Sequence, residues 1–237
     1  MKRKFLAKAI TLGLMLVVPL GVEAANYSPT ETSYTEDGKV NLLYKFENGS
    51  ASNISAFGIN YIEQKYKYDN KEINDLTIIR TKGSGGFLTA SYNPFNLTVG
   101  GNLTIMSLIN PEKTWGPTLH IDNGDDKNER NMSLSAKNVV LSSDKSQAIN
   151  LVARKEGIKT NLDLNATDSI NISSEKSGTI NIGVVDGNQV EGKINLNIAA
   201  GNNVTISSGK TAISSTFDKG VINIDAGNLL QISSNDK

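Results

Sequence analysis

The residues best suited to chemistry lie in one acidic stretch near the middle of the chain, IDNGDDKNER, which carries Asp122, Asp125, Asp126 and Glu129. Clustered carboxylates can bind a hard cation such as calcium, which takes about six to eight oxygen ligands. This stretch does not match the spacing of the EF-hand calcium loop, and its composition is typical of a solvated turn between strands. We therefore predict a turn here, and we expect no metal, no cofactor and no catalytic residue in the chain.

His120 is the single histidine of the chain, and there is no cysteine. An imidazole pair, an HExxH motif, a thiol nucleophile and a zinc-thiolate site are therefore excluded by composition. We interpret His120 as an ordinary residue of a strand near residues 118–121, without a catalytic role.

Two glycine-containing stretches remain as candidate sites. Residues 82–86, KGSGG, lack the spacing of a phosphate-binding loop and are not followed by a helical pattern. Residues 99–102, VGGN, are typical of a hairpin or of a corner between strands. We predict no ligand chemistry for either stretch.

The overall composition excludes one class of partner and suggests an architecture. The 24 basic and 24 acidic residues give no net charge, so nothing in the balance predicts a nucleic-acid partner. Asparagine, serine and threonine make up more than a quarter of the chain, whereas aromatic residues make up only 6%. This composition suits either disorder or a repetitive β structure.

The N-terminus has the features of an export signal. The first eight residues, MKRKFLAK, carry four basic side chains, and an apolar stretch follows at 9–22. We predict a signal peptide at residues 1–24, with cleavage after Ala24 or, as the alternative, after Ala25. A retained membrane anchor is disfavoured because the apolar stretch is shorter than the roughly 20 residues that span a bilayer. We expect no transmembrane helix in the mature chain.

Degenerate repeats occupy the second half of the chain. The segments that begin at Asn138, Ser169, Asn203 and Leu229 align on the serines Ser142, Ser173, Ser207 and Ser233, which are 31, 34 and 26 residues apart. The segment NLTIMS at 102–107 is a fainter member. A period near thirty residues that tolerates insertions is typical of a stacked array.

Within each repeat, apolar residues alternate with polar residues, which predicts short strands with one buried face. Three such strands fit into one repeat, and we therefore predict a right-handed parallel β-helix of about seven coils in the mature chain. An antiparallel sandwich is the alternative, disfavoured by the low aromatic content. The expected strand markers are Leu162, Ile170, Ile180, Ile194, Val204, Ile213, Ile222 and Leu230.

The first part of the mature chain is less regular and holds nearly all of its aromatic residues. The end of a stacked array must cover an exposed apolar cross-section, so we interpret residues 25–95 as an N-terminal cap with irregular first coils and residues 96–237 as the β-helix repeats. An aromatic surface that binds carbohydrate is the competing interpretation, and it would require the rings to face solvent.

The export signal, the absence of cysteine and repeats such as LDLNATDSINISSEKSGTINIG and KINLNIAAGNNVTISSGKTAISS resemble the passenger region of bacterial type V autotransporters and related adhesins. The resemblance covers roughly residues 96–237. It implies a nonenzymatic adhesin or stalk at the surface of a Gram-negative bacterium, outer-membrane associated or secreted. It also implies two kinds of partner, a surface protein or glycan of a host or neighbouring cell, and a translocation barrel outside this chain.

Two alternatives accompany this expectation. Because the chain ends in mid-repeat, we expect either a fragment of a longer protein or a truncated reading frame. Parallel β-helices also occur in secreted enzymes that act on polysaccharides, such as lyases and glycoside hydrolases, and these bring acidic residues of neighbouring coils into one groove. Three or more carboxylates in one cleft would favour the enzyme.

Overall fold

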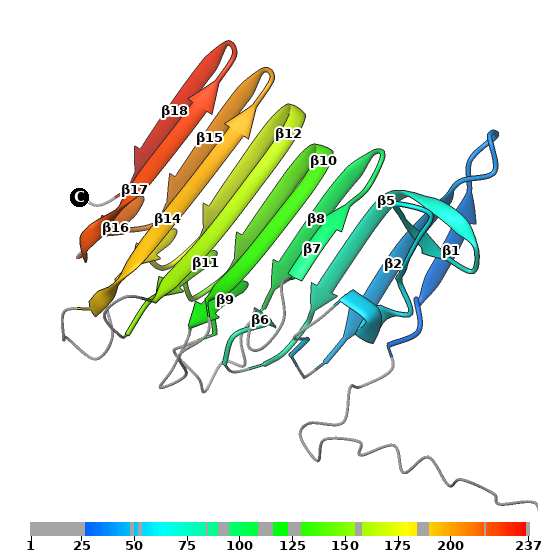
Figure 1. The fold of residues 1–237 in the computed structure, drawn as a ribbon, viewed down its shortest axis with the longest axis horizontal. Helices are drawn as coiled ribbons and strands as arrows, with labels where there is room; N and C mark the ends of the chain where they lie inside the picture. The colour runs from blue at the N-terminus through cyan, green and yellow to red at the C-terminus, as the bar shows by residue number, and fades with distance from the viewer. Residues whose placement is uncertain are drawn as a thin grey trace, which may run out of the picture.

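The computed structural model describes residues 27–47, 50–51, 54–83, 85–89, 95–108, 116–122, 129–154, 158–183, 190–215 and 217–235. The predicted signal peptide lies outside these residues, as do Asp125 and Asp126. Strands stack side by side from one end of the described chain to the other, and no α-helix occurs among them (Figure 1). The all-β class predicted from the sequence is therefore confirmed. In this part of the chain, no helix is long and apolar enough to cross a membrane.

The strands form a 13-stranded and a 5-stranded sheet. The larger sheet contains β1 (Glu31–Tyr34), β2 (Val40–Phe46), β3 (Asn60–Ile62), β4 (Lys65–Tyr68), β5 (Lys71–Arg80), β7 (Phe95–Thr98), β8 (Asn102–Ser107), β10 (Arg130–Ser143), β12 (Lys159–Ser174), β14 (Val190–Ala200), β15 (Asn203–Ser208), β17 (Phe217–Ala226) and β18 (Leu229–Ser234). The smaller sheet contains β6 (Leu88–Thr89), β9 (Leu119–Asp122), β11 (Ile149–Val152), β13 (Ile180–Ile182) and β16 (Ile213–Ser215). A short 3-10 helix, η1, spans Ile54–Phe57.

The parallel pairing confirms the repeat alignment made from the sequence. The four serines of the alignment occupy equivalent positions on neighbouring strands, in the order Ser142, Ser173, Ser207 and Ser233. Asn102, in the fainter repeat, likewise pairs with Asn138. Each successive strand or pair of strands of the larger sheet therefore adds one layer, here called a rung. From β2 to β17 and β18, the described chain forms seven parallel rungs.

All eight strand markers lie in strands, but two of them share one. Leu162 and Ile170 both belong to β12, where the sequence suggested two separate strands. The chain stays in the larger sheet through β12, but its pairing with β10 shifts: Ala136 pairs with Ala166 and Asn138 with Ser169, so β12 holds one more residue than β10 across the bend. This extra residue forms a β-bulge, which bends the strand and locally disrupts the hydrogen-bond ladder.

Alternation along each strand sends every second side chain into one continuous core. Equivalent aliphatic residues of successive rungs lie in columns, and their burial contributes about 2 kcal/mol for each side chain. One fully buried column consists of Leu76, Leu103, Val139, Ile170 and Val204.

A second column in the interior is polar. Arg80 pairs with Ser107, and the column continues through Ser143, Ser174 and Ser208, all buried. The serine hydroxyls of this column can donate hydrogen bonds to backbone carbonyls. Ser174 Oγ, for example, donates to the carbonyl of Ser146, 28 residues earlier in the chain, at 2.7 Å. Arg80 is the exception: β5 places its buried guanidinium at the position that serine occupies in the later rungs.

Aromatic rings pack together at the N-terminal end of the described strands. Phe46 stacks on Tyr27 with ring centroids 4.5 Å apart and meets Phe87 edge-on at 5.1 Å. Phe57 is fully buried and packs against Tyr44 at 5.2 Å. The first parallel rung pair, β2 with β5, already lies within the segment expected to hold the cap and first coils.

Residues 218–220, DKG, have the composition of a turn but lie inside β17, where Gly220 pairs with Ile194. The neighbouring strand supplies a ladder for this segment, and pairing overrides the local turn preference. Residues 99–102 form a corner, as expected, but the strands on either side, β7 and β8, both pair in parallel with β10, so this is not a hairpin.

Candidate binding surface

The acidic stretch around β9 is used for ion pairs between rungs. Asp122 Oδ1 accepts a hydrogen bond from Arg154 Nε at 2.9 Å, and Glu129 forms an ion pair of 3.3 Å with Lys159. Among the described residues, no group of three or more His, Asp or Glu side chains is arranged to hold a metal ion. The other two acidic residues of the stretch fall outside the described chain.

His120 lies in β9, in line with the expectation of a strand residue. Its Nδ1 is 3.2 Å from the side-chain nitrogen of Asn150, and its Nε2 is 3.9 Å from Asp122 Oδ2. Burial lowers the pKa of the imidazole, and the nearby Asp122 carboxylate partly opposes that effect. The ring is therefore neutral near pH 7 and acts as a hydrogen-bonding residue of the smaller sheet.

The glycines of residues 82–86 allow close packing. A Cβ at Gly83 would lie 2.6 Å from Arg80 Cδ, and one at Gly86 would lie 2.5 Å from His120 Cβ. Arg80 Nη2 donates to the carbonyl of Gly85 at 3.0 Å and to that of Gly116 at 3.4 Å. The described glycines of this stretch thus pack closely against a buried arginine and against His120.

The outward face of the larger sheet carries two rows of polar side chains, all amides except the carboxylate Asp163, here called the polar ladder face. In one row, Asn195 Nδ2 donates to Asn161 Oδ1 at 2.6 Å, and Asn161 in turn donates to Asn131. In the other, Asn223 donates to Asn197 at 3.0 Å, and Asn197 to Asp163 at 2.6 Å. These side chains line a groove of about 320 Å³ that runs across the rungs.

The ladders leave hydrogen-bonding capacity on the surface. A primary amide has two N–H donors and an oxygen with two lone pairs, and a ladder bond uses one donor and one lone pair of each interior member. Because parallel strands lie about 4.8 Å apart, the outward-facing donors repeat at that spacing along the face. An array of this kind can hydrogen-bond a ligand that has many hydroxyl or carbonyl groups.

The smaller sheet carries a matching but shorter ladder. Asn181 Nδ2 donates to Asn150 Oδ1 at 2.8 Å, and Asn150 contacts His120. Asn150 is buried, whereas the members of the polar ladder face are half-buried or exposed. The two ladders therefore share their chemistry, and they differ in solvent access at Asn150, whereas Asn181 is half-buried like Asn161 and Asn195.

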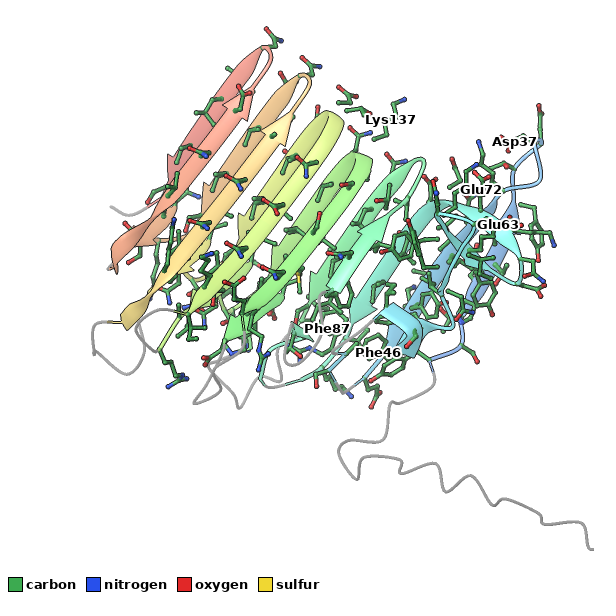
Figure 2. The ribbon with its side chains drawn as sticks, in the orientation of Figure 1. Asp37, Phe46, Glu63, Glu72, Phe87 and Lys137 are labelled. Carbon is green, nitrogen blue, oxygen red and sulfur yellow. The ribbon has the colours of Figure 1, made fainter. Side chains whose placement is uncertain are left out.

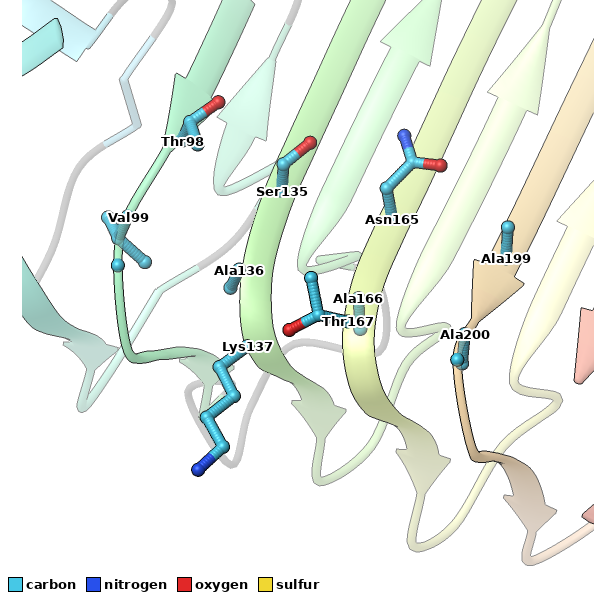
Figure 3. A pocket seen from close by; sticks show the side chains of 12 residues that line it. Thr98, Val99, Ser135, Ala136, Lys137, Asn165, Ala166, Thr167, Ala199 and Ala200 are labelled. Carbon is cyan, nitrogen blue, oxygen red and sulfur yellow. The ribbon is translucent and has the colours of Figure 1, made fainter. Parts of the chain in front are cut away.

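A concave strip of small side chains adjoins the polar ladder face at the bend of the strands. Figure 3 shows Thr98, Ser135, Ala136, Ala166 and Ala200 along this strip, which encloses about 450 Å³. The strip follows the bend of β10 and β12 and the ends of β7 and β14. Its small side chains let the backbones of successive rungs turn together.

A larger cleft lies at the N-terminal end of the same sheet. It encloses about 860 Å³ and is lined by the β3–β4 hairpin on one side and by β5 and the end of β7 on the other. The cleft shares Asn96 with the groove of the polar ladder face, and it shares residues 98–100 with the concave strip. The three hollows are therefore neighbours along one side of the molecule.

Sequence analysis did not identify either the ladder face or the cleft. The asparagines were visible as polar residues at every second position, but their role as an outward array requires the register between rungs. Nothing in the alternation of apolar and polar residues predicted the β3–β4 hairpin. A signal was nevertheless present, since tyrosines and lysines alternate in KYKY at 65–68 between two short turns.

For the polysaccharide-enzyme alternative, one further cleft of about 470 Å³ brings together two carboxylates from neighbouring rungs, Asp144 and Glu175, among serines. This is fewer than the three carboxylates that would favour an enzyme, and the alternative remains a prediction. No protein-family model, curated protein or solved structure matches this chain.

Proposed function

We propose that this chain is an exported, nonenzymatic surface protein of a Gram-negative bacterium, similar to an autotransporter passenger, whose polar ladder face contacts another cell. In this proposal the two sheets belong to one right-handed parallel β-helix. Two sheets that each extend by parallel pairing with every repeat support this architecture, and parallel crossover connections are right-handed in nearly all proteins. Residues 1–24 act as the signal peptide.

The polar ladder face is the observation that carries the proposal. Its amides are held in place by their ladder bonds, so binding a ligand costs little side-chain entropy. Each outward amide contributes a modest hydrogen bond of about 1 kcal/mol, and useful affinity therefore requires many contacts at once. Such a surface suits a large, repetitive partner, such as a glycan layer or a surface protein on a host or neighbouring cell.

Adhesion of protein-coated beads tests the proposal. Beads carrying the purified mature chain are counted after washing on epithelial cells and on a bacterial lawn. We expect attachment of wild-type beads to at least one surface, and a severalfold loss with the double variant Asn161→Ala, Asn195→Ala. These substitutions remove amides from the polar ladder face and leave the buried columns intact.

The double variant Asn150→Ala, Asn181→Ala is the matched control, because it removes a ladder from the smaller sheet. It is expected to attach like the wild type once circular dichroism confirms that both variants keep their strand content. Equal loss of attachment in the two variants would show that ladder removal acts through stability. Failure of wild-type beads to attach to any surface would refute the adhesin proposal.

Export is tested separately with a reporter. Residues 1–25 fused to alkaline phosphatase, which is active only after export from the cytoplasm, should give activity in a Gram-negative host. Replacing the basic residues Lys2, Arg3 and Lys4 by glutamate should abolish that activity, because a signal peptide needs a positive N-terminal region.

A further inference from the structure

The cleft between the β3–β4 hairpin and β5 has the size and lining of a ligand site. Pockets for small ligands enclose roughly 300 to 1,000 Å³ and combine an apolar floor with a few polar groups, and this cleft of about 860 Å³ falls within that range. Its floor includes Ile59 and Ile73, both buried. Its rim carries three side-chain amides, those of Asn60, Gln64 and Asn96.

One wall of the cleft presents an aromatic ring to solvent. Tyr61 is 63% exposed, and its ring centroid lies 4.9 Å from that of Tyr66 on the facing strand of the hairpin. Tyr66 is itself half-buried. Large rigid rings of this kind supply contact area at low cost in conformational entropy. An exposed ring that lines a cleft is a better indication of a ligand site than an exposed ring on a convex surface.

The charged groups of the cleft neutralise one another. Lys65 of β4 is ion-paired with Glu72 of β5, and Lys39 forms an ion pair of 2.7 Å with Asp37. Figure 2 shows Asp37, Glu63 and Glu72 together in this corner of the molecule, away from Phe46 and Phe87. A strongly charged ligand would have to compete with these pairs, whereas a neutral ligand would not.

The turn that orients this wall is conformationally unusual. Glu63 and Gln64, which join β3 to β4, have φ angles of 52° and 64°. This left-handed conformation costs a non-glycine residue free energy, and asparagine or glycine usually occupies it. Gln64 nevertheless lines the cleft, and its side chain would be lost if glycine occupied this position.

We propose that this cleft binds a neutral oligosaccharide, with one sugar ring stacked on Tyr61 and its hydroxyl groups bonded to the amides of Gln64, Asn60 and Asn96. A sugar offers an apolar ring face together with a belt of hydroxyls, which matches an exposed aromatic ring beside amides. Because Asn96 also lines the groove of the polar ladder face, a longer glycan can continue from the cleft toward that face. The cleft adjoins the polar ladder face at Asn96, but this assignment does not depend on the adhesin proposal.

Calorimetric titration of the mature chain with neutral hexasaccharides tests this assignment. The probes are the hexamers of cellulose, xylan, mannan and chitin, and a hexamer of polygalacturonate and a heparin-derived hexasaccharide serve as charged comparisons. We expect at least one neutral probe to bind, with affinity lowered on the order of tenfold by Tyr61→Ala. Tyr61→Phe, which keeps the ring, should stay within about twofold of the wild type.

Tyr34→Ala is the matched control, because Tyr34 is 55% exposed at the same end of the molecule and does not line the cleft. It should leave the affinity unchanged. Failure of all neutral probes to bind, stronger binding of the charged probes, or equal losses with Tyr61→Ala and Tyr34→Ala would overturn the proposal. Bead adhesion of Asn161→Ala, Asn195→Ala is scored independently, so either proposal can fail alone.

Discussion

The N-terminal rungs and the later rungs are built on the same parallel ladder but are stabilised differently. From β10 to β15, many positions pair with a like residue of the next rung, such as Leu162 with Leu196, Ser173 with Ser207 and Asn161 with Asn195. The N-terminal rungs instead contain Phe46, Arg80 and Phe87, whose contacts are not repeated in the later rungs. In the repetitive region many similar contacts share the stabilisation, whereas in the N-terminal region a few unique contacts carry it.

The largest expected effect is at Arg80, the member of the serine column that belongs to the N-terminal region. Its Nε and Nη2 donate to Ser107 Oγ at 2.9 and 2.6 Å, and its guanidinium lies 5.0 Å from the Phe87 ring centroid. Arg80→Met removes these contacts and leaves buried acceptors without their donor, so we expect the free energy of unfolding to fall by about 3 kcal/mol or more. Urea denaturation followed by circular dichroism measures the change.

Ser174→Ala is the comparison from the repetitive region, at an equivalent position of the same column. It removes one hydrogen bond to the Ser146 carbonyl, and we expect a loss of about 1 kcal/mol. If the two variants lost equal stability, unique contacts would be no more important than repeated ones, and the contrast between the regions would be wrong.

This contrast also explains which parts of the fold could be predicted from the sequence. Alternation and repeat spacing are properties of neighbouring residues, so the alignment of Ser142 with Ser173 and the strand at Ile180 were predicted correctly. The contacts of Arg80 could not be predicted. Its acceptors, the carbonyls of Gly85 and Gly116, lie outside the strands, and no repeat pattern indicates their position relative to Arg80. The cleft was missed for the same reason, because Tyr61 and Asn96 are far apart in the sequence and line one cleft only in the folded chain.

An intermediate effect is expected at His120, an irregular member of an otherwise asparagine ladder. Burial lowers the pKa of this imidazole from its ordinary value of 6.5. As the pH falls through 6.5, the unfolded chain binds a proton that the folded chain does not, so the free energy of unfolding decreases until folded His120 is also protonated. Above about pH 7 both states are neutral, and this contribution is constant.

Denaturation between about pH 5.5 and 7.5 measures this dependence in the wild type and in His120→Asn. The asparagine can accept a hydrogen bond from Asn150 and would extend the ladder of the repetitive region to β9. We expect the variant to have a flatter stability profile across this window. An unchanged profile would show that the pH dependence arises from another group.

The smallest expected effect concerns the two turns of the β3–β4–β5 segment, which differ in sequence but share a left-handed backbone. Asp69 and Asn70, with φ angles of 48° and 61°, already suit this conformation, whereas Glu63 and Gln64 do not. The double variant Glu63→Asn, Gln64→Gly should therefore raise the free energy of unfolding by about 1 kcal/mol, and Asn70→Gly by less. The ion pair between Glu63 and Lys67 that is lost is exposed on the Glu63 side and offsets little of this gain.

Both turn variants are compared by thermal unfolding and by oligosaccharide titration. If Gln64 contacts the sugar, the first variant becomes more stable but binds more weakly, whereas Asn70→Gly leaves binding unchanged because Asn70 does not line the cleft. A gain in stability without a loss of affinity would remove Gln64 from the site while leaving Tyr61 in it. The left-handed backbone at Glu63 and Gln64 would then have no role in binding. The comparison of the two turns therefore tests whether an unfavourable backbone conformation is retained because it places Gln64 in the cleft.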